Sequence, residues 1–156
     1  MNSHLKELID NELPINILIH IVKTIRSNKV PQVLVLQSGT GSGKSSIIPP
    51  KLCLALSDDI WVSEPRVINC KDVSHQITKY NKEFIMGENI GFETGSLSIR
   101  PKRKPSITFM TVRVMKNKLT TVINKGYGCP GFIIFDEVHD NEISLDIAIA
   151  TAKELI

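Results

Sequence analysis

The sequence predicts an α/β fold in which helices alternate with short, buried strands of a mainly parallel sheet. Its strand candidates are continuous apolar runs, and helical periodicity fills the intervals between them. The strand candidates are 33–36, 60–62, 107–110 and 132–135. The helix candidates are 13–25, a helix that starts near Lys44, 67–80, 112–123 and 143–156. Such runs are typical of strands buried on both faces, and parallel strands bring ligands to their carboxyl ends.

The length and apolar content predict one domain. The chain has 156 residues, and its hydrophobic content of 42% suits a single core. Residues 1–30 are assigned to a helical lead-in and residues 31–156 to the domain. The last helical pattern reaches residue 156 without a glycine or proline stop, so we expect the chain to end before the domain is complete.

Charge and cysteine content restrict the partners and the compartment. The net charge is only +3, so a polyanion would have to be bound by a local patch. The cysteines lack metal-ligand spacing and are expected to be buried or free thiols in a reducing compartment; they are Cys53, Cys70 and Cys129. No apolar run reaches the roughly 18 residues that span a bilayer, and no signal-peptide core is present. We therefore expect an intracellular, soluble protein without a membrane partner.

A glycine-rich run lies between the first strand candidate and the next helix. It reads Ser38, Gly39, Thr40, Gly41, Ser42, Gly43, Lys44, Ser45, which matches a phosphate-binding P-loop with serine in place of the first glycine. Glycines let successive backbone N–H groups converge on phosphate oxygens, and the helix start adds positive partial charge. We expect Lys44 to reach the β and γ phosphates, Ser45 to bind Mg²⁺, and the nucleotide site to extend to Ser46. The alternative, a Gly/Ser turn without a ligand, is disfavoured by the strand–loop–helix context.

Two acids follow the strand candidate at 132–135. We expect Asp136 to hold Mg²⁺ through its water ligands, and Glu137 to orient and deprotonate the water that attacks the γ phosphate. The alternative is capping of the next helix, because carboxylates are favourable at a helix N-terminus. Beside a P-loop the catalytic interpretation is favoured. By itself His139 is more typical of a solvated helix start.

These segments resemble the superfamily 2 DExH/DEAH-box RNA helicases and look most like those of poxvirus type. Motif I would be 38–45 and motif II Asp-Glu-Val-His at 136–139; further matches are Leu13–Pro14 at the entry segment, Pro65–Arg66–Val67 at motif Ia, Gly91–Phe92 at a glycine-aromatic motif and Thr111 at motif Ib. They occur in the family's order and cover nearly the whole chain. Val112 and Arg113 depart from the motif Ib pattern, which leaves the RNA contacts there open.

The resemblance implies the N-terminal RecA-like lobe of an ATP-dependent RNA helicase, with ATP and Mg²⁺ as cofactors. Lys44 and Glu137 would serve hydrolysis, and His139 would couple nucleotide state to RNA binding. Arg66 and Thr111 would contact RNA phosphates. The implied partners are RNA, with DNA left open, and a second RecA-like lobe of the same full-length protein, without which unwinding is not expected. A viral protein of this kind would act in the host cytoplasm or in the virion.

The residues leave two other functions open. A P-loop enzyme of another class, such as a small-molecule kinase, would use the same phosphate cradle but would also need an acceptor pocket. The other alternative is a non-catalytic, nucleotide-dependent binding module, against which Glu137 argues.

A basic cluster lies before the strand candidate at 107–110. Its cations are Arg100, Lys102, Arg103 and Lys104, and Pro101 and Pro105 predict a loop. Lysine and arginine could release counterions from RNA phosphates. We favour a solvated loop, because the cluster enters its strand from the end opposite Thr111.

Overall fold

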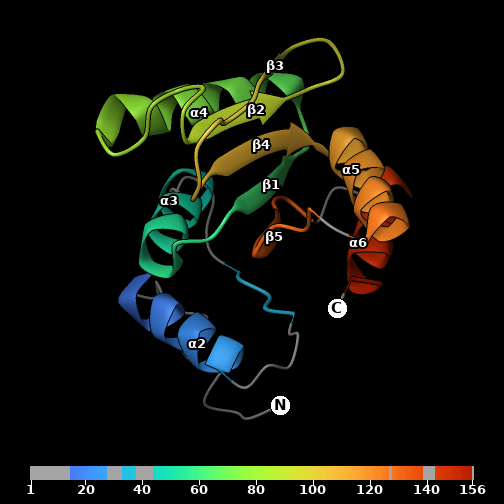
Figure 1. The fold of residues 1–156 in the computed structure, drawn as a ribbon, viewed down its shortest axis with the longest axis horizontal. Coiled ribbons are helices and arrows are strands. Elements are labelled where there is room, and N and C mark those ends of the chain that lie inside the picture. The colour runs from blue at the N-terminus through green and yellow to red at the C-terminus, as the bar shows by residue number, and fades with distance from the viewer. Residues whose placement is uncertain (1–14, 28–32, 38–43, 127, 139–142, 156) are drawn as a thin grey trace.

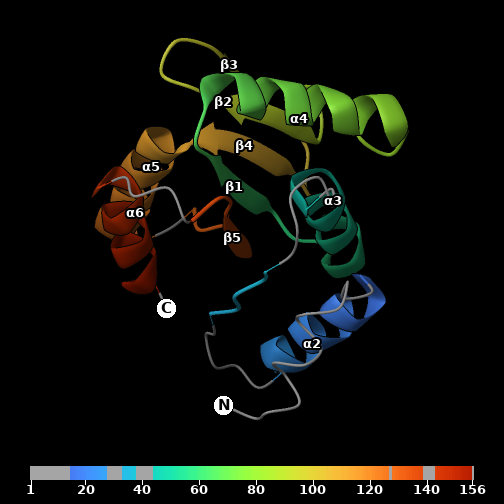
Figure 2. The same ribbon diagram turned by 180° about the vertical axis from the view of Figure 1, so that it is seen from behind.

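The computed structural model describes residues 15–27, 33–37, 44–126, 128–138 and 143–155. Within these ranges a five-stranded sheet has helices on both faces (Figures 1 and 2). The strands are β1 (Ile60–Glu64), β2 (Ile90–Glu93), β3 (Ser98–Ile99), β4 (Ile107–Thr111) and β5 (Phe132–Phe135). The helices are α2 (Ile15–Ser27), α3 (Lys44–Leu56), α4 (Val67–Tyr80), α5 (Val112–Lys125) and α6 (Ile143–Lys153).

The strand order is β3-β2-β4-β1-β5. β1 pairs in parallel with β4 and β5, and β2 pairs in parallel with β4. Among the strands of the described ranges, only β3 is antiparallel, and it pairs with β2. The predicted α/β fold with a mainly parallel sheet is confirmed.

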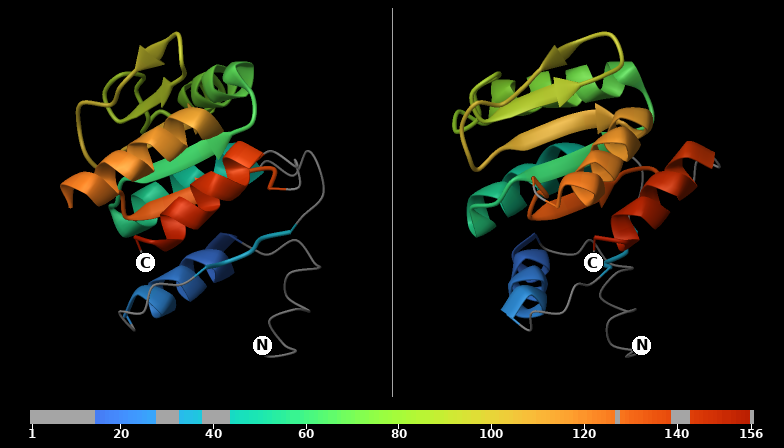
Figure 3. Two further views of the ribbon diagram at one scale, coloured as in Figure 1. Left: turned by 90° about the vertical axis from the view of Figure 1, so that its right-hand side faces the viewer. Right: turned by 45° about the vertical axis from the view of Figure 1, so that its right-hand side comes forward.

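The sheet separates two apolar layers because strand side chains alternate between its faces. In β1, Ile60 and Val62 join the cluster with α2, α3 and α4, whereas Trp61 lies in the cluster with α5 and α6. Figure 3 shows α5 and α6 together on their side of the sheet. Both faces are therefore covered, which explains why the strands are continuous apolar runs.

Several helix limits follow from local chemistry. α3 begins at Lys44, as expected, and contains the buried Pro49 and Pro50. α5 ends at Lys125 and is followed by the C-cap Gly126, whose φ of 70° is left-handed and whose N–H donates to the Val122 carbonyl at 2.8 Å. Glycine adopts this conformation without the cost that a Cβ imposes.

The apolar run at 33–36 is not a strand in the structure, and this prediction was wrong. Val33 and Val35 are 68% and 67% exposed, while Leu36 packs against the core. A strand needs a neighbouring edge for its hydrogen bonds, and an apolar run by itself does not show that it has one. Among the described residues, β5 forms the edge of the sheet and pairs only with β1.

The β2–β3 hairpin was not predicted as strands, because the two strands are too short for a periodic signal. The presence of glycine at position 91 in β2 has a steric explanation, because an added Cβ would overlap the Ile99 carbonyl of β3. The glycine of the expected glycine-aromatic motif is therefore needed for close strand pairing.

Candidate nucleotide and nucleic-acid sites

The carboxyl ends of β1, β4 and β5 lie side by side at one edge of the sheet. Glu64 of β1 pairs with Thr111 of β4, and Ser63 pairs with Phe135 of β5. The Asp136 N–H then donates to the Ser63 carbonyl at 3.2 Å. This register brings the acids after β5 beside the end of β1, where motif Ia begins.

Ser45 and Asp136 are in direct contact across 91 residues of sequence: the Ser45 hydroxyl donates a hydrogen bond to Asp136 Oδ2. These are the two residues expected to bind Mg²⁺. Mg²⁺ accepts oxygen ligands and is commonly held by one or two carboxylates together with substrate phosphates. The described residues contain no cluster of three or more His, Cys, Asp or Glu arranged for a metal. The Ser45 hydroxyl and the Asp136 carboxylate are oxygen groups of the kind that Mg²⁺ binds together with a nucleotide.

Glu137 has an uncommon backbone conformation, with a φ of 51°. Its N–H donates to Asp136 Oδ1 at 2.9 Å, and its side chain is exposed. Left-handed backbone is uncommon outside glycine and often occurs at functional sites. Asp136 thus uses one carboxylate oxygen for Ser45 and the other to hold the turn that directs Glu137.

Glu64 is an acidic residue of this edge that the sequence analysis did not single out. Its side chain is 2% exposed, and Oε1 has no hydrogen-bond partner among the described residues. Burial, together with the neighbouring charges of Asp136 and Glu137, raises the pKa of Glu64 to about 7, although hydrogen bonding from the Asn69 side chain opposes the increase. The signal in the sequence was a carboxylate at the last position of a buried strand.

Arg66 and Thr111 precede the helices that follow two neighbouring strands. Arg66 is the N-cap of α4 and is exposed, while Thr111 is the N-cap of α5 and is partly exposed. Neither side chain makes a capping hydrogen bond. Helix N-termini attract anions through their unpaired N–H groups. Both residues are therefore placed where phosphates could be bound.

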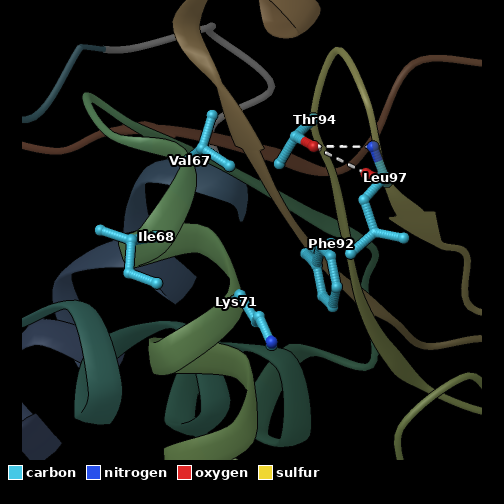
Figure 4. A pocket seen from close by; sticks show the side chains of 6 residues that line it. All are labelled: Val67, Ile68, Lys71, Phe92, Thr94 and Leu97. Carbon is cyan, nitrogen blue, oxygen red and sulfur yellow. Dashed lines mark hydrogen bonds between the residues drawn. The ribbon is translucent and has the colours of Figure 1, made fainter.

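A small pocket of about 200 Å³ lies between the start of α4 and the turn after β2 (Figure 4). Its lining consists of Val67, Ile68, Lys71, Phe92, Thr94 and Leu97. The Thr94 hydroxyl closes the turn by accepting from the Leu97 N–H at 3.0 Å and donating to its carbonyl at 2.8 Å. Phe92 is only 1% exposed, so its ring offers no free face for base stacking.

The basic cluster forms a loop, as expected, and three of its four cationic side chains pair with acids. Arg100 bonds to Glu93 at 2.9 Å, Arg103 pairs with Glu88, and Lys104 pairs with Asp59. These cations are already partly balanced by neighbouring carboxylates, which reduces their attraction for RNA.

Part of the predicted nucleotide site lies outside the described residues, namely Ser38, Gly39, Thr40, Gly41, Ser42, Gly43 and His139, as does the Leu13–Pro14 entry segment. Lys44, Ser45 and Ser46 form the first turn of α3 and are partly exposed. Their roles stay predictions.

None of the helices in the described ranges is long and apolar enough to cross a membrane. All three cysteines are free thiols; Cys53 and Cys70 are buried and Cys129 is exposed.

The fold and this edge define a class of protein. A mainly parallel sheet flanked by helices, with a serine at the start of α3 against an acid after β5, is consistent with a RecA-like helicase domain. No family model matches the chain.

Comparison with curated proteins shows similarity to DExH/DEAH-box ATP-dependent RNA helicases. The chain is 31% identical over 144 residues to the probable ATP-dependent RNA helicase spindle-E of Anopheles gambiae, covering 87% of this chain and 9% of that protein. It is 29% identical over 150 residues to the DExH-box ATP-dependent RNA helicase DExH6 of Arabidopsis thaliana, covering 87% and 11%. A putative RNA helicase of African swine fever virus, B962L, is 23% identical over 169 residues, covering 94% and 17%.

The resemblance indicated by the motifs is confirmed, and the chain is similar to a helicase domain. It spans between 9% and 17% of the length of these relatives. Because one of the three is viral and two are not, a viral origin stays a prediction.

Proposed function

We propose that this chain is the ATP-binding first motor lobe of a DExH-box RNA helicase. In the proposal, ATP hydrolysis drives translocation on RNA and unwinding once a second RecA-like lobe is joined to it. The observation that carries the proposal is the hydrogen bond between Ser45 and Asp136, because it joins a residue of motif I to a residue of motif II. The names of the relatives support the use of ATP and RNA.

The proposed chemistry divides among a few side chains. Lys44 binds the β and γ phosphates, and Ser45 and Asp136 hold Mg²⁺, which balances phosphate charge when it is bound with ATP. Glu137 takes a proton from the attacking water. Its side chain is exposed, so water can reach its carboxylate. His139 and the glycine-rich run 38–43 complete the site by the family resemblance.

The proposed RNA track runs along the same edge of the sheet. Arg66 follows β1 and Thr111 ends β4, and the ends of these strands are paired, so both residues can contact phosphates of one strand. Contacts to phosphates are independent of base sequence. The track lies beside the nucleotide acids, which permits coupling between the two sites.

Lys44→Ala tests the nucleotide site. The variant should weaken binding of a fluorescent ATP analogue by about tenfold or more, because it removes a charge-assisted contact to the phosphates. Lys51→Ala is the matched control, since Lys51 is an exposed lysine of the same helix. Equal affinities of the two folded variants would contradict the P-loop assignment.

RNA stimulation separates the proposed function from its alternatives. In the full-length protein, single-stranded RNA should accelerate ATP hydrolysis. A small-molecule kinase would respond to its acceptor and not to RNA, and a non-catalytic module would show no turnover with or without RNA.

A further inference from the structure

Glu64 lies at the centre of the edge that carries both proposed sites. It ends β1, which pairs with β4 on one side and β5 on the other, so it lies between Thr111 and Asp136. It is 2% exposed, and its Oε1 has no hydrogen-bond partner among the described residues. A buried carboxylate without full pairing is costly, so its presence calls for an explanation.

Glu64 lies shortly before α4, which begins at Val67. Asn69 lies in the first turn of this helix, and hydrogen bonding from its side chain lowers the pKa of Glu64. Arg66 occupies the N-cap position of this helix. Glu64 therefore connects the acids of the nucleotide site with the helix that presents the proposed RNA contact.

We propose that Glu64 is a positioning residue that couples occupation of the ATP site to the placement of Arg66, an inference that rests on the proposed function. When no cation balances Asp136, Asp136 and Glu137 repel the Glu64 carboxylate. Once the charge of Asp136 is balanced by the metal bound with ATP, this repulsion falls. Glu64 then accepts a stronger, charge-assisted hydrogen bond from Asn69. The first turn of α4 is held more firmly, and Arg66 binds RNA phosphate more tightly.

The coupling is measured as a ratio of RNA affinities. Fluorescence anisotropy gives the affinity of the chain for a short single-stranded RNA, with and without Mg²⁺ and a non-hydrolysable ATP analogue. The analogue should tighten RNA binding by the wild-type chain about fivefold or more, within the ordinary range of allosteric coupling. Glu64→Gln keeps the shape but lacks the charge, so the ratio should fall to about one while RNA affinity without analogue stays near that of the wild type.

Two further variants distinguish coupling from a structural role. Asn69→Ala removes the same link from the helix side and should also bring the ratio to about one. Glu93→Gln is the matched control, because Glu93 also ends a buried strand and is 4% exposed, but it pairs with Arg100 and Lys118. Its ratio should equal that of the wild type even where its melting temperature falls.

The outcomes separate this inference from the proposed function. A wild-type ratio of one, or an unchanged ratio in Glu64→Gln, overturns the coupling while the ATP site stands. Titration of the analogue in the absence of RNA gives the second readout. If the wild-type chain does not bind the analogue in that titration, the proposed function fails and this inference fails with it.

Discussion

Asp136 and Glu137 are adjacent in sequence, but their contacts predict different defects. Glu137→Gln should retain Mg²⁺-dependent ATP binding and lower turnover of the full-length protein by about a hundredfold or more, because glutamine cannot accept the water's proton. Asp136→Ala should weaken Mg²⁺-dependent binding as well, since it removes the oxygens that contact Ser45 and the Glu137 N–H. Isothermal titration and steady-state ATPase assays measure the two effects. If both variants only lost stability, with turnover per folded molecule intact, the acids would be helix caps.

Glu64 should make folding stability depend on pH. Its pKa is about 7 in the folded chain against an ordinary value of 4.5, so the folded state binds more protons between these values. The free energy of unfolding should therefore fall as pH rises through this range, by on the order of 3 kcal/mol, and level off above it. Urea unfolding at a series of pH values, with a chelator present, measures the slope. Glu64→Gln should lack this component; an identical slope in both proteins would show that other groups cause it.

At the scale of elements, we expect different contributions to RNA binding from two parts of the sheet. The helix starts after β1 and β4 should bind RNA, whereas the loop before β4 should contribute less. Arg66→Ala should weaken binding to unrelated RNA sequences by similar factors and reduce the salt slope by about 1. Replacing Lys102, Arg103 and Lys104 with alanine should have less effect on RNA and more on thermal stability, because Arg103 and Lys104 pair with Glu88 and Asp59. Binding measured over a salt series distinguishes the two. Loss of most affinity in the loop variant, with none lost in Arg66→Ala, would place the RNA track elsewhere.

At the scale of the whole molecule, the proposed function makes this chain one of two lobes that hydrolyse ATP together. We expect the 156-residue chain to bind ATP but to hydrolyse it very slowly, because an arginine supplied in trans is worth on the order of a thousandfold or more in such reactions. A steady-state ATPase assay of this chain measures the rate. Turnover near ~10 s⁻¹, typical of a complete enzyme, would favour another class of P-loop enzyme.

The sequence by itself determined the features that depend on neighbouring residues. The helix expected at 67–80 and the strand expected at 132–135 have the limits of α4 and β5, because apolar periodicity and turn residues act locally. The order of the motifs along the chain was likewise sufficient to indicate the helicase resemblance. The residues of the proposed nucleotide site could be predicted from the sequence because each motif is short and continuous, and their roles stay predictions.

Only the tertiary structure decided the features that depend on which strand edges and side chains meet. The run at 33–36 has the composition of a buried strand, yet it does not pair with the sheet among the described residues. The contact between Ser45 and Asp136 spans 91 residues, and no local pattern encodes it. Glutamate is usually a surface residue. The parallel register of β1 with β4 and β5 nevertheless buries Glu64 beside two other acids. Burial and like-charge repulsion arise from this packing, so the unusual pKa of Glu64 could not be inferred before the strands were placed.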